Sequence, residues 1–384
     1  ETAFEVLQQI QEFPEERREN IISFAIGEPD FDTPEHIKQA GVEAIKKNYT
    51  HYTPSSGIPE LREAIANFAS ETKNIKITSK NVVILPAAKF IVDLALLSCT
   101  NPGDEVIYPN PGYPIYESLI NVHNCKAVPA YLLESENWNY NINDLRNLIT
   151  EKTKLIIINS PENPTGSMLN QSTLEALAEI ALENDLWILS DEIYSNIIYD
   201  NQEYISIGAH PDMQNRTIIL DGFSKYFAMT GWRIGYAIVN EQLAEYFTRW
   251  ATNTISCTAS FTQKAGLVAI EEEKSASQSM VKEFERRRDL MYKRLNDLNG
   301  ISTLKPKGAF YVFANVTKAC EEKGLESSLE FQDYVLENAD VAILSREYFG
   351  KKSPQEENKY VRFSYCVSYE EIEEGMNRLK KLFP

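Results

Sequence analysis

Lys225 lies in the run GFSKYFAMTGWRIGYA (residues 222–237), one residue after the hydroxyl of Ser224 and eight before the guanidinium of Arg233. A lysine flanked by apolar side chains and a fixed cation should have a pKa below its usual value, because burial and like charge both disfavour the ammonium form. A neutral amine is what a nucleophile toward an aldehyde needs. The alternative is an ordinary loop lysine beside a segment that packs in the core.

The arginine of this run indicates what the amine would meet. Its planar and permanently charged fork suits a phosphate held by two parallel hydrogen bonds. The glycines of the run allow backbone and ligand to approach closely, since glycine lacks a Cβ atom. Together, the amine, the hydroxyl and the guanidinium predict a site for a phosphorylated aldehyde, and pyridoxal phosphate is the leading candidate.

Two further polar residues directly follow apolar runs that read as buried strands. Asp191 follows residues 186–190, and Asn163 lies in NSPENPTG (159–166), after residues 154–159. A carboxylate ~4 Å from a protonated pyridine nitrogen is attracted by ~4 kcal/mol at an effective dielectric of 20, and an amide there could donate to a phenolate oxygen. The alternatives are a helix-capping aspartate and a turn-forming asparagine.

Arg362 lies in the apolar run YVRFSY (360–365). A buried charge is costly unless it is paired, and the α-carboxylate of an amino acid is a natural partner for a guanidinium. The alternative is an ion pair within the protein.

The elements that must position these residues alternate between strand and helix patterns. Strands are expected at 81–85, 105–108, 126–132, 154–159, 186–190, 216–220 and 233–239, with helices between them at 88–98, 113–122 and 171–184. Several of these strands are apolar without alternation, as strands buried on both faces should be. Strands that alternate with helices predict a mostly parallel sheet of seven strands covered by helices, with ligands at the carboxyl ends of the strands.

A second and smaller unit is expected near residue 275. A long helix at about 276–298 is followed by strands near 310–313, 341–344 and 360–365 and by helices at 328–338 and 369–382. This pattern predicts an α+β unit, and two units agree with a length of 384 residues. The predicted α/β protein thus divides into an N-terminal segment packing with the small unit (1–40), a large cofactor-binding unit (41–275) and a small C-terminal unit (276–384).

Composition excludes several other classes of protein. The net charge of −18 argues against binding to nucleic acid, and the basic run Arg286–Arg288 has acidic neighbours, which favours a solvated helix face. The chain contains no apolar stretch near the ~20 residues of a membrane span, and its start lacks the pattern of a signal peptide. Five cysteines and four histidines are scattered, so no metal site is expected and a reducing cytoplasm fits best.

The motifs resemble those of the class I/II aminotransferases, the fold type I enzymes that depend on pyridoxal phosphate. The resemblance extends from about residue 20 to 382 and rests on motifs in the expected order: 24–34, 49–62, LPAAK (85–89), PNPGYPIY (109–116), 159–166 and 222–237. It implies a homodimeric aminotransferase related to aspartate aminotransferases, with ping-pong kinetics and with amino acids and 2-oxo acids as substrates.

The resemblance also implies a role for individual residues. Lys225 would hold the cofactor and act as the catalytic base. Gly27, Arg362 and Lys89 would bind the substrate. The remaining positions would contact the cofactor: Ala87, Ala88, Lys89, Ser224 and Arg233 near its phosphate, Asp191 at its ring nitrogen, Asn163 and Tyr194 at its phenolate oxygen, Tyr113 on its ring, and Tyr52 at the phosphate of the neighbouring subunit. Relatives commonly have glycines where Ala87 and Ala88 stand.

The identity of the amino donor depends on two residues that favour different substrates. Lys89 would suit a second carboxylate and therefore aspartate or glutamate, whereas the dicarboxylate-specific branches usually have tryptophan at the position of Tyr113. Aspartate with 2-oxoglutarate is the leading prediction. The alternatives are aromatic, aliphatic or basic donors, a β-lyase on the same fold, and a non-enzymatic binding protein, which would need a DNA-binding module that this acidic chain is not expected to carry.

Overall fold

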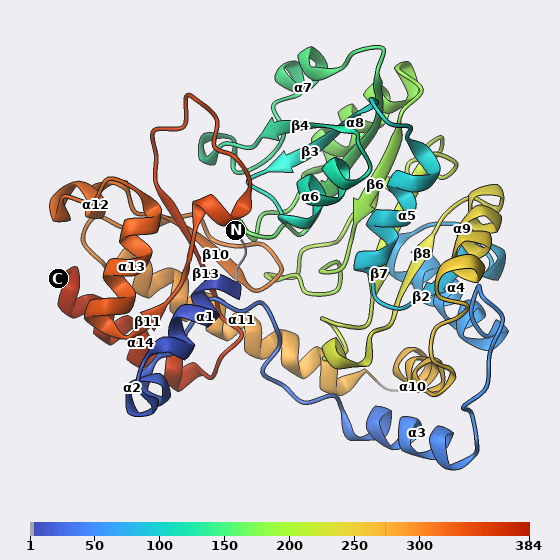
Figure 1. The fold of residues 1–384 in the computed structure, drawn as a ribbon, viewed down its shortest axis with the longest axis horizontal. Helices are drawn as coiled ribbons and strands as arrows, with labels where there is room; N and C mark the ends of the chain where they lie inside the picture. The colour runs from blue at the N-terminus through green and yellow to red at the C-terminus, as the bar shows by residue number, and fades with distance from the viewer. Residues whose placement is uncertain (1–3, 273) are drawn as a thin grey trace.

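The computed structural model describes residues 4–272 and 274–384, so residues 1–3 of the predicted N-terminal segment and residue 273 of the large unit lie outside it. Figure 1 shows two lobes, a larger one drawn in blue to yellow and a smaller one in orange to red, with the first two helices beside the smaller lobe. None of the helices described here is long and apolar enough to cross a membrane.

All seven predicted strands form one sheet in the larger lobe. Its order is β2-β8-β7-β6-β5-β3-β4. Only β8 runs antiparallel to its neighbours, and the other pairs are parallel. The strands are β2 (Val82–Leu85), β3 (Glu105–Asn110), β4 (Lys126–Tyr131), β5 (Thr153–Asn159), β6 (Trp187–Asp191), β7 (Thr217–Gly222) and β8 (Gly235–Ile238).

Helices cover both faces of this sheet, as the apolar strands predicted. One face packs against α5 (Lys89–Cys99), α6 (Ile115–Val122) and α9 (Glu241–Thr254). The other face packs against α7 (Ile142–Leu148) and α8 (Gln171–Glu183) at one end, and against α4 (Pro59–Lys73) and α10 (Ser260–Glu271) at the other. Residues of β2, β3, β7 and β8 are buried throughout, because neither face of the sheet meets solvent.

The carboxyl ends of β5, β6 and β7 meet at one edge of the sheet. In the parallel register, Asn159 lies opposite Asp191, and Asp191 lies opposite Leu220. The turn that carries Lys225 leaves β7 at this edge. Three loops that are distant in the sequence therefore begin side by side.

The smaller lobe is built on a four-stranded sheet in the order β12-β13-β10-β9, with antiparallel pairs. Its strands are β9 (Ser302–Thr303), β10 (Tyr311–Asn315), β12 (Leu344–Ser345) and β13 (Tyr360–Ser364), and its helices are α11 (Ser275–Asn296), α12 (Thr317–Lys323), α13 (Ser328–Ala339) and α14 (Tyr369–Leu382). The single strand predicted at 341–344 is wrong in one respect. The chain divides at Ile343, because β11 (Val341–Ala342) pairs with β1 (Ile22–Ser23) while β12 pairs with β13.

The N-terminal segment contacts both lobes. Helices α1 (Phe4–Glu12) and α2 (Glu15–Asn20) lie beside the smaller lobe (Figure 1), and Arg17 of α2 pairs with Asp340 at 2.8 Å. Helix α3 (Glu35–Lys46), in contrast, packs against α10 of the larger lobe. The predicted boundary at residue 40 falls inside α3, and the division into units stays a prediction.

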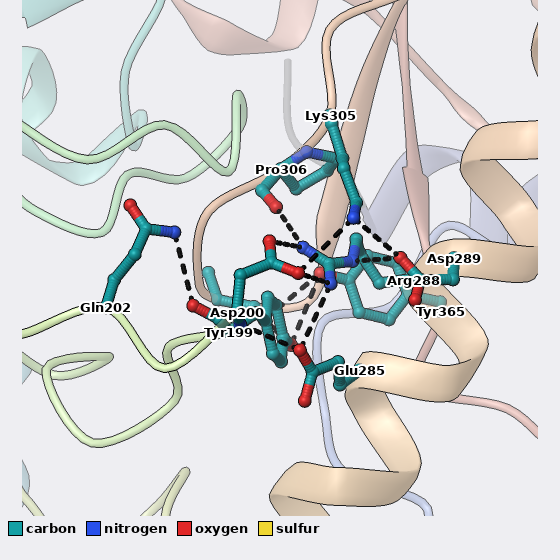
Figure 2. Close-up of polar contacts among 10 residues, drawn as sticks. Tyr199, Asp200, Gln202, Glu285, Arg288, Asp289, Lys305, Pro306 and Tyr365 are labelled. Carbon is teal, nitrogen blue, oxygen red and sulfur yellow. Dashed lines mark hydrogen bonds and ion pairs between the residues drawn. The ribbon is translucent and has the colours of Figure 1, made fainter.

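The arginine run of α11 corrects one prediction. Arg286 is exposed and pairs with Glu283, but Arg287 and Arg288 are buried, so the solvated face predicted for all three is wrong. Figure 2 shows Arg288 between Asp200 of the larger lobe and the carbonyl oxygen of Pro306, each at 2.8 Å. Arg287 and Arg288 turn inward instead: Arg287 pairs with Asp30 of the N-terminal segment, and Arg288 links α11 to the larger lobe through Asp200.

Candidate active site

Lys225 lies in the turn that follows β7. Its Nζ donates a hydrogen bond to the carbonyl oxygen of Gly27 at 2.6 Å and lies 5.6 Å from the centre of the Phe310 ring. Burial lowers the pKa of Lys225 to about 8, and the charges of Arg362 and Arg233 contribute to this decrease. The expected depression of the amine pKa is therefore present, and burial is its main cause.

Asp191 is the last residue of β6 and its carboxylate is buried. Oδ2 accepts a hydrogen bond from the hydroxyl of Tyr116 at 2.6 Å, and Oδ1 accepts one from the backbone N–H of Ile193 at 3.2 Å. Burial raises the pKa of Asp191 to about 6, although the two hydrogen bonds oppose this increase. The bond to Ile193 closes a turn, and no helix begins directly after Asp191, so the alternative of a helix-capping aspartate is wrong.

Tyr116 is a site residue that the sequence analysis missed. It lies within PNPGYPIY, three residues after Tyr113, and the two rings meet edge to face at 5.7 Å. The motif pointed to this segment. Only the fold, however, brings the hydroxyl to a carboxylate 75 positions further along the chain.

Arg362 and Asn163 contact each other between the lobes. The NH1 group of Arg362 donates to Oδ1 of Asn163 at 2.8 Å, and NH2 donates to the carbonyl oxygen of Ala25 at 2.5 Å. The guanidinium lies 4.4 Å from the centre of the Tyr311 ring, and its buried Nε has no hydrogen-bond partner among the described residues. No carboxylate in the described part of the chain pairs with Arg362, so this buried cation keeps a donor for an anion from outside.

Tyr311, also missed from the sequence, closes one side of the site. Its hydroxyl lies 2.8 Å from the hydroxyl of Tyr194, in contact with the backbone of Gly27. A Cβ atom on Gly27 would overlap the Tyr311 hydroxyl, so the segment can approach this closely only with glycine. Gly27 and Tyr194 are thus brought together with Lys225, as predicted.

The turn between β2 and α5 offers donors for an anion. Helix α5 begins at Lys89 after Ala88, and no side chain caps its start. The N–H groups of Phe90 and Ile91 donate to the carbonyl oxygens of Ala87 and Ala88, which leaves those of Ala88 and Lys89 as the donors for a phosphate. Ala87 has a φ angle of +92°, a conformation in which glycine is favoured, in agreement with the glycine that the family resemblance leads us to expect there. The backbone of Gly235 packs directly against Ala87 and Ala88.

The remaining predicted residues lie at the edge of the site or outside it. Arg233 is exposed, donates to the carbonyl oxygen of Thr230 at 2.6 Å, and lies eight residues after Lys225. Lys89 is exposed, with its Nζ 5.9 Å from the centre of the Tyr113 ring. Ser224 is half-buried in the lysine turn. Tyr52 is 87% exposed and is the predicted residue that this chain alone does not bring to the others.

These residues fit a phosphorylated pyridine aldehyde. An amine of depressed pKa, a buried carboxylate at a strand end, an uncapped helix start and a buried guanidinium with an unused donor provide one suitable group for each part of such a molecule and its substrate. In the described part of the chain, no group of three or more His, Cys, Asp and Glu residues is arranged so that it could hold a metal ion.

The fold and this arrangement define a fold type I enzyme, and comparison with known proteins agrees. The family described as aminotransferase class I and II matches residues 19–379. The aspartate aminotransferase of Pyrococcus abyssi is 40% identical over 366 residues, which cover 94% of this chain and 92% of that protein. Aromatic-amino-acid aminotransferase 2 of Thermococcus litoralis is also 40% identical, over 367 residues and 95% and 92% of the two chains.

A solved structure is similar over almost the whole length. The aromatic aminotransferase of Pyrococcus horikoshii superposes with a TM-score of 0.89 at 37% identity, covering 98% of both chains. The chain belongs to the class I and II aminotransferase family, whose members depend on pyridoxal phosphate. It is a transaminase that acts on amino acids and 2-oxo acids.

Proposed function

We propose that this aminotransferase binds pyridoxal phosphate through the residues described above and exchanges an amino group between L-aspartate and 2-oxoglutarate. The proposal depends mainly on two features that occur together in the site. Lys225 is an amine of depressed pKa, and Arg362 is a buried cation without a carboxylate partner among the described residues. The first suits a base and the second suits the α-carboxylate of a substrate.

The cofactor, when bound, would withdraw electrons from the Cα atom of the substrate through its ring. Lys225 would hold it until the amino group of the substrate displaces the lysine, and the freed Nζ would then take the proton from Cα, because a base with a pKa near the working pH is effective. Asp191, ionised above pH about 6, would keep the ring nitrogen protonated. Asn163, whose Oδ1 is occupied by Arg362, would donate its amide N–H to the phenolate oxygen.

Tyr194 would be a second donor to that oxygen, and Tyr113 would stack on the ring. At the other end of the cofactor, the phosphate would meet the start of α5 and the side chains of Ser224 and Arg233, with Lys89 nearby.

A homodimer with shared sites accounts for the exposure of Tyr52. This side chain is 87% exposed, and Val42, Ile45 and Tyr49 on the same stretch of chain are each more than 40% exposed. Exposed apolar residues that lie together mark interaction surfaces. A second copy of the chain would cover them and receive Tyr52 at its phosphate site. The division into units and the cytoplasmic location stay predictions.

Aspartate is favoured over other donors by Lys89. Its exposed ammonium stands beside Tyr113 on the same side as the predicted phosphate site, where it could meet a second carboxylate. The relatives are divided at equal identity, since one is named for aspartate and another for aromatic amino acids. An aromatic donor is therefore the second candidate, and Tyr113 is the residue that favours it.

The test is a panel of amino acids added to the cofactor-loaded protein, with conversion of the cofactor to its aminated form followed by absorbance. We expect aspartate and glutamate to convert it and Lys225→Ala to abolish conversion. Lys89→Gln should weaken conversion by dicarboxylates while sparing monocarboxylic donors. Conversion mainly by aromatic donors would refute aspartate, and release of pyruvate and ammonia without a 2-oxo acid would indicate a lyase. Failure to take up the cofactor would refute the assignment of Lys225.

A further inference from the structure

A second lysine is buried behind the site. Lys73, the last residue of α4, is 2% exposed. Its Nζ lies 2.9 Å from Oε2 of Glu192 and 2.9 Å from Oδ2 of Asp221, and it donates to the hydroxyl of Ser195 at 2.7 Å. A lysine is rarely buried completely, and the ionic partners of this one lie at the carboxyl ends of the strands of the large sheet.

Both carboxylates are neighbours of Asp191. Glu192 follows it in the chain, and Asp221 follows Leu220, which lies opposite Asp191 in the register of β6 and β7. Asp221 also precedes Lys225 by four residues. The partners of Lys73 are therefore close in the chain or in the sheet to Asp191 and Lys225, the two residues on which the proposed function depends.

Hydrogen bonds hold the carboxylates in place. Oε1 of Glu192 accepts from the hydroxyls of Ser190 at 3.0 Å and Ser206 at 2.6 Å, and Oδ1 of Asp221 accepts from the N–H of Gly222 at 2.7 Å. A cluster fixed in this way cannot turn toward solvent when its charge changes. Any change in charge must therefore act on the groups around it.

The cluster has one cation and two carboxylates, so its charge is +1 − 2 = −1. Asp191 is a third buried carboxylate. Its side chain reaches Tyr116 of α6, on the face of the sheet opposite to the one on which Lys73 of α4 meets Asp221. Burial is the main cause that raises the pKa of Asp191, and the charges of Asp221 and Glu192 raise it further. Without Lys73 the two neighbours would have a charge of −2, and the protonated form of Asp191 would be favoured.

We propose that Lys73 is a positioning residue for the transamination site: its ammonium compensates the carboxylates of Glu192 and Asp221, and so keeps Asp191 ionised toward the ring nitrogen of the cofactor. This rests on the proposed function, because it takes Asp191 as the partner of that nitrogen. Lys73 acts through its neighbours and does not itself touch the substrate or the cofactor.

The tyrosines around the cluster stay uncharged near neutral pH. Burial raises the pKa of each surrounding tyrosine well above its usual value: Tyr116 from α6, Tyr194 after β6, Tyr204 beside Lys73, and Tyr236 from β8. The charged groups that act on Asp191 from this side are therefore Asp221 and Glu192, which Lys73 contacts directly.

The experiment is a titration of the cofactor-free protein with pyridoxal phosphate across the pH range around neutrality. In the wild type we expect affinity to fall as the pH decreases through about 6. Lys73→Met should move this midpoint upward by about one pH unit, which lowers the affinity about twofold at pH 7 and about tenfold at pH values below both midpoints. The double variant Lys73→Met/Glu192→Gln returns the cluster to a charge of −1, and it should restore the midpoint. Lys76→Met, an exposed lysine nearby, is the matched control.

A midpoint that does not move in Lys73→Met, or that moves and is not restored in the double variant, would overturn the proposal. Should Lys73→Met fail to fold, Asp221→Asn provides an independent test, since it makes the cluster neutral and should move the midpoint downward; no movement would count against the role of Lys73. A wild type that takes up no cofactor would refute the proposed function. Uptake with unshifted variants would refute the role of Lys73 alone.

Discussion

Replacement of Gly235 by alanine tests how closely the lysine motif packs against the predicted phosphate turn. Gly235 begins β8 and lies opposite Leu85 in the sheet. A Cβ atom there would overlap the N atom of Ala88, and it would lie 2.8 Å from the Cα of Ala88 and 2.9 Å from the carbonyl carbon of Ala87. All three are backbone atoms, so no side chain can rotate to make room. Since ordinary contacts begin at 3.4 Å, the turn must move by about half an ångström or more.

This displacement gives the magnitude of the expected effect. Overpacking of this kind costs about 1–3 kcal/mol of the free energy of unfolding. The start of α5 would move with the turn, so the affinity for pyridoxal phosphate should fall by about tenfold or more, because an error of ~1 Å in positioning can cost 10²-fold. Both quantities can be measured, by urea unfolding of the cofactor-free protein and by titration with the cofactor.

Gly231 provides the matched control within the same motif. A Cβ atom on Gly231 would meet nothing within 4 Å, so Gly231→Ala should leave stability and cofactor affinity close to the wild type. The reasoning would be refuted if Gly235→Ala kept wild-type stability and affinity, or if both alanine variants lost the same amount.

Three further predictions use the same unfolding and titration measurements. Ala87→Gly should stabilise the protein by about 0.5–1 kcal/mol, because its φ of +92° strains alanine, whereas Ala88→Gly should destabilise it by a similar amount; equal signs would refute the strain. Arg288→Met should cost about 2–3 kcal/mol by leaving the carboxylates of Figure 2 uncompensated, and exposed Arg286→Met much less. The rate of covalent cofactor uptake by Lys225 should rise with pH and level off above about 8; a plateau near 10.5 would exclude the effect of burial.

Much of the large sheet could be predicted because its strands carry a strong local signal. Runs such as 154–159 and 216–220 are apolar on both faces, and they form strands with bounds close to those expected. The prediction of one continuous strand at 341–344 was wrong, because four apolar residues do not show which strands they will pair with. Partners 319 and 18 positions away, Ile22 and Arg362, divide that run between two sheets.

The candidate site could be predicted where chemistry and motif coincide within a few residues. Lys225 and Asp191 follow strands whose ends must meet, so their approach was expected from topology. Tyr116 and Lys73 carried no such signal, since their partners lie 75 and more than 100 positions away. Arg288 was misjudged for a related reason: acidic neighbours indicate solvent only if the helix has a free face, and α11 lies between two lobes.

Burial has opposite consequences for the two central groups of the site. It lowers the pKa of Lys225 to about 8, which favours the neutral base, and it raises the pKa of Asp191 to about 6, which disfavours the ionised carboxylate. Deeper burial would lower the pKa of Lys225 further and raise that of Asp191 further, so it would favour the neutral amine at the expense of the ionised carboxylate. Burial alone therefore cannot give both groups the charge that the site needs. The hydrogen bonds from Tyr116 and Ile193 act only on Asp191. Specific contacts must therefore keep the carboxylate ionised in surroundings that the lysine requires to be apolar.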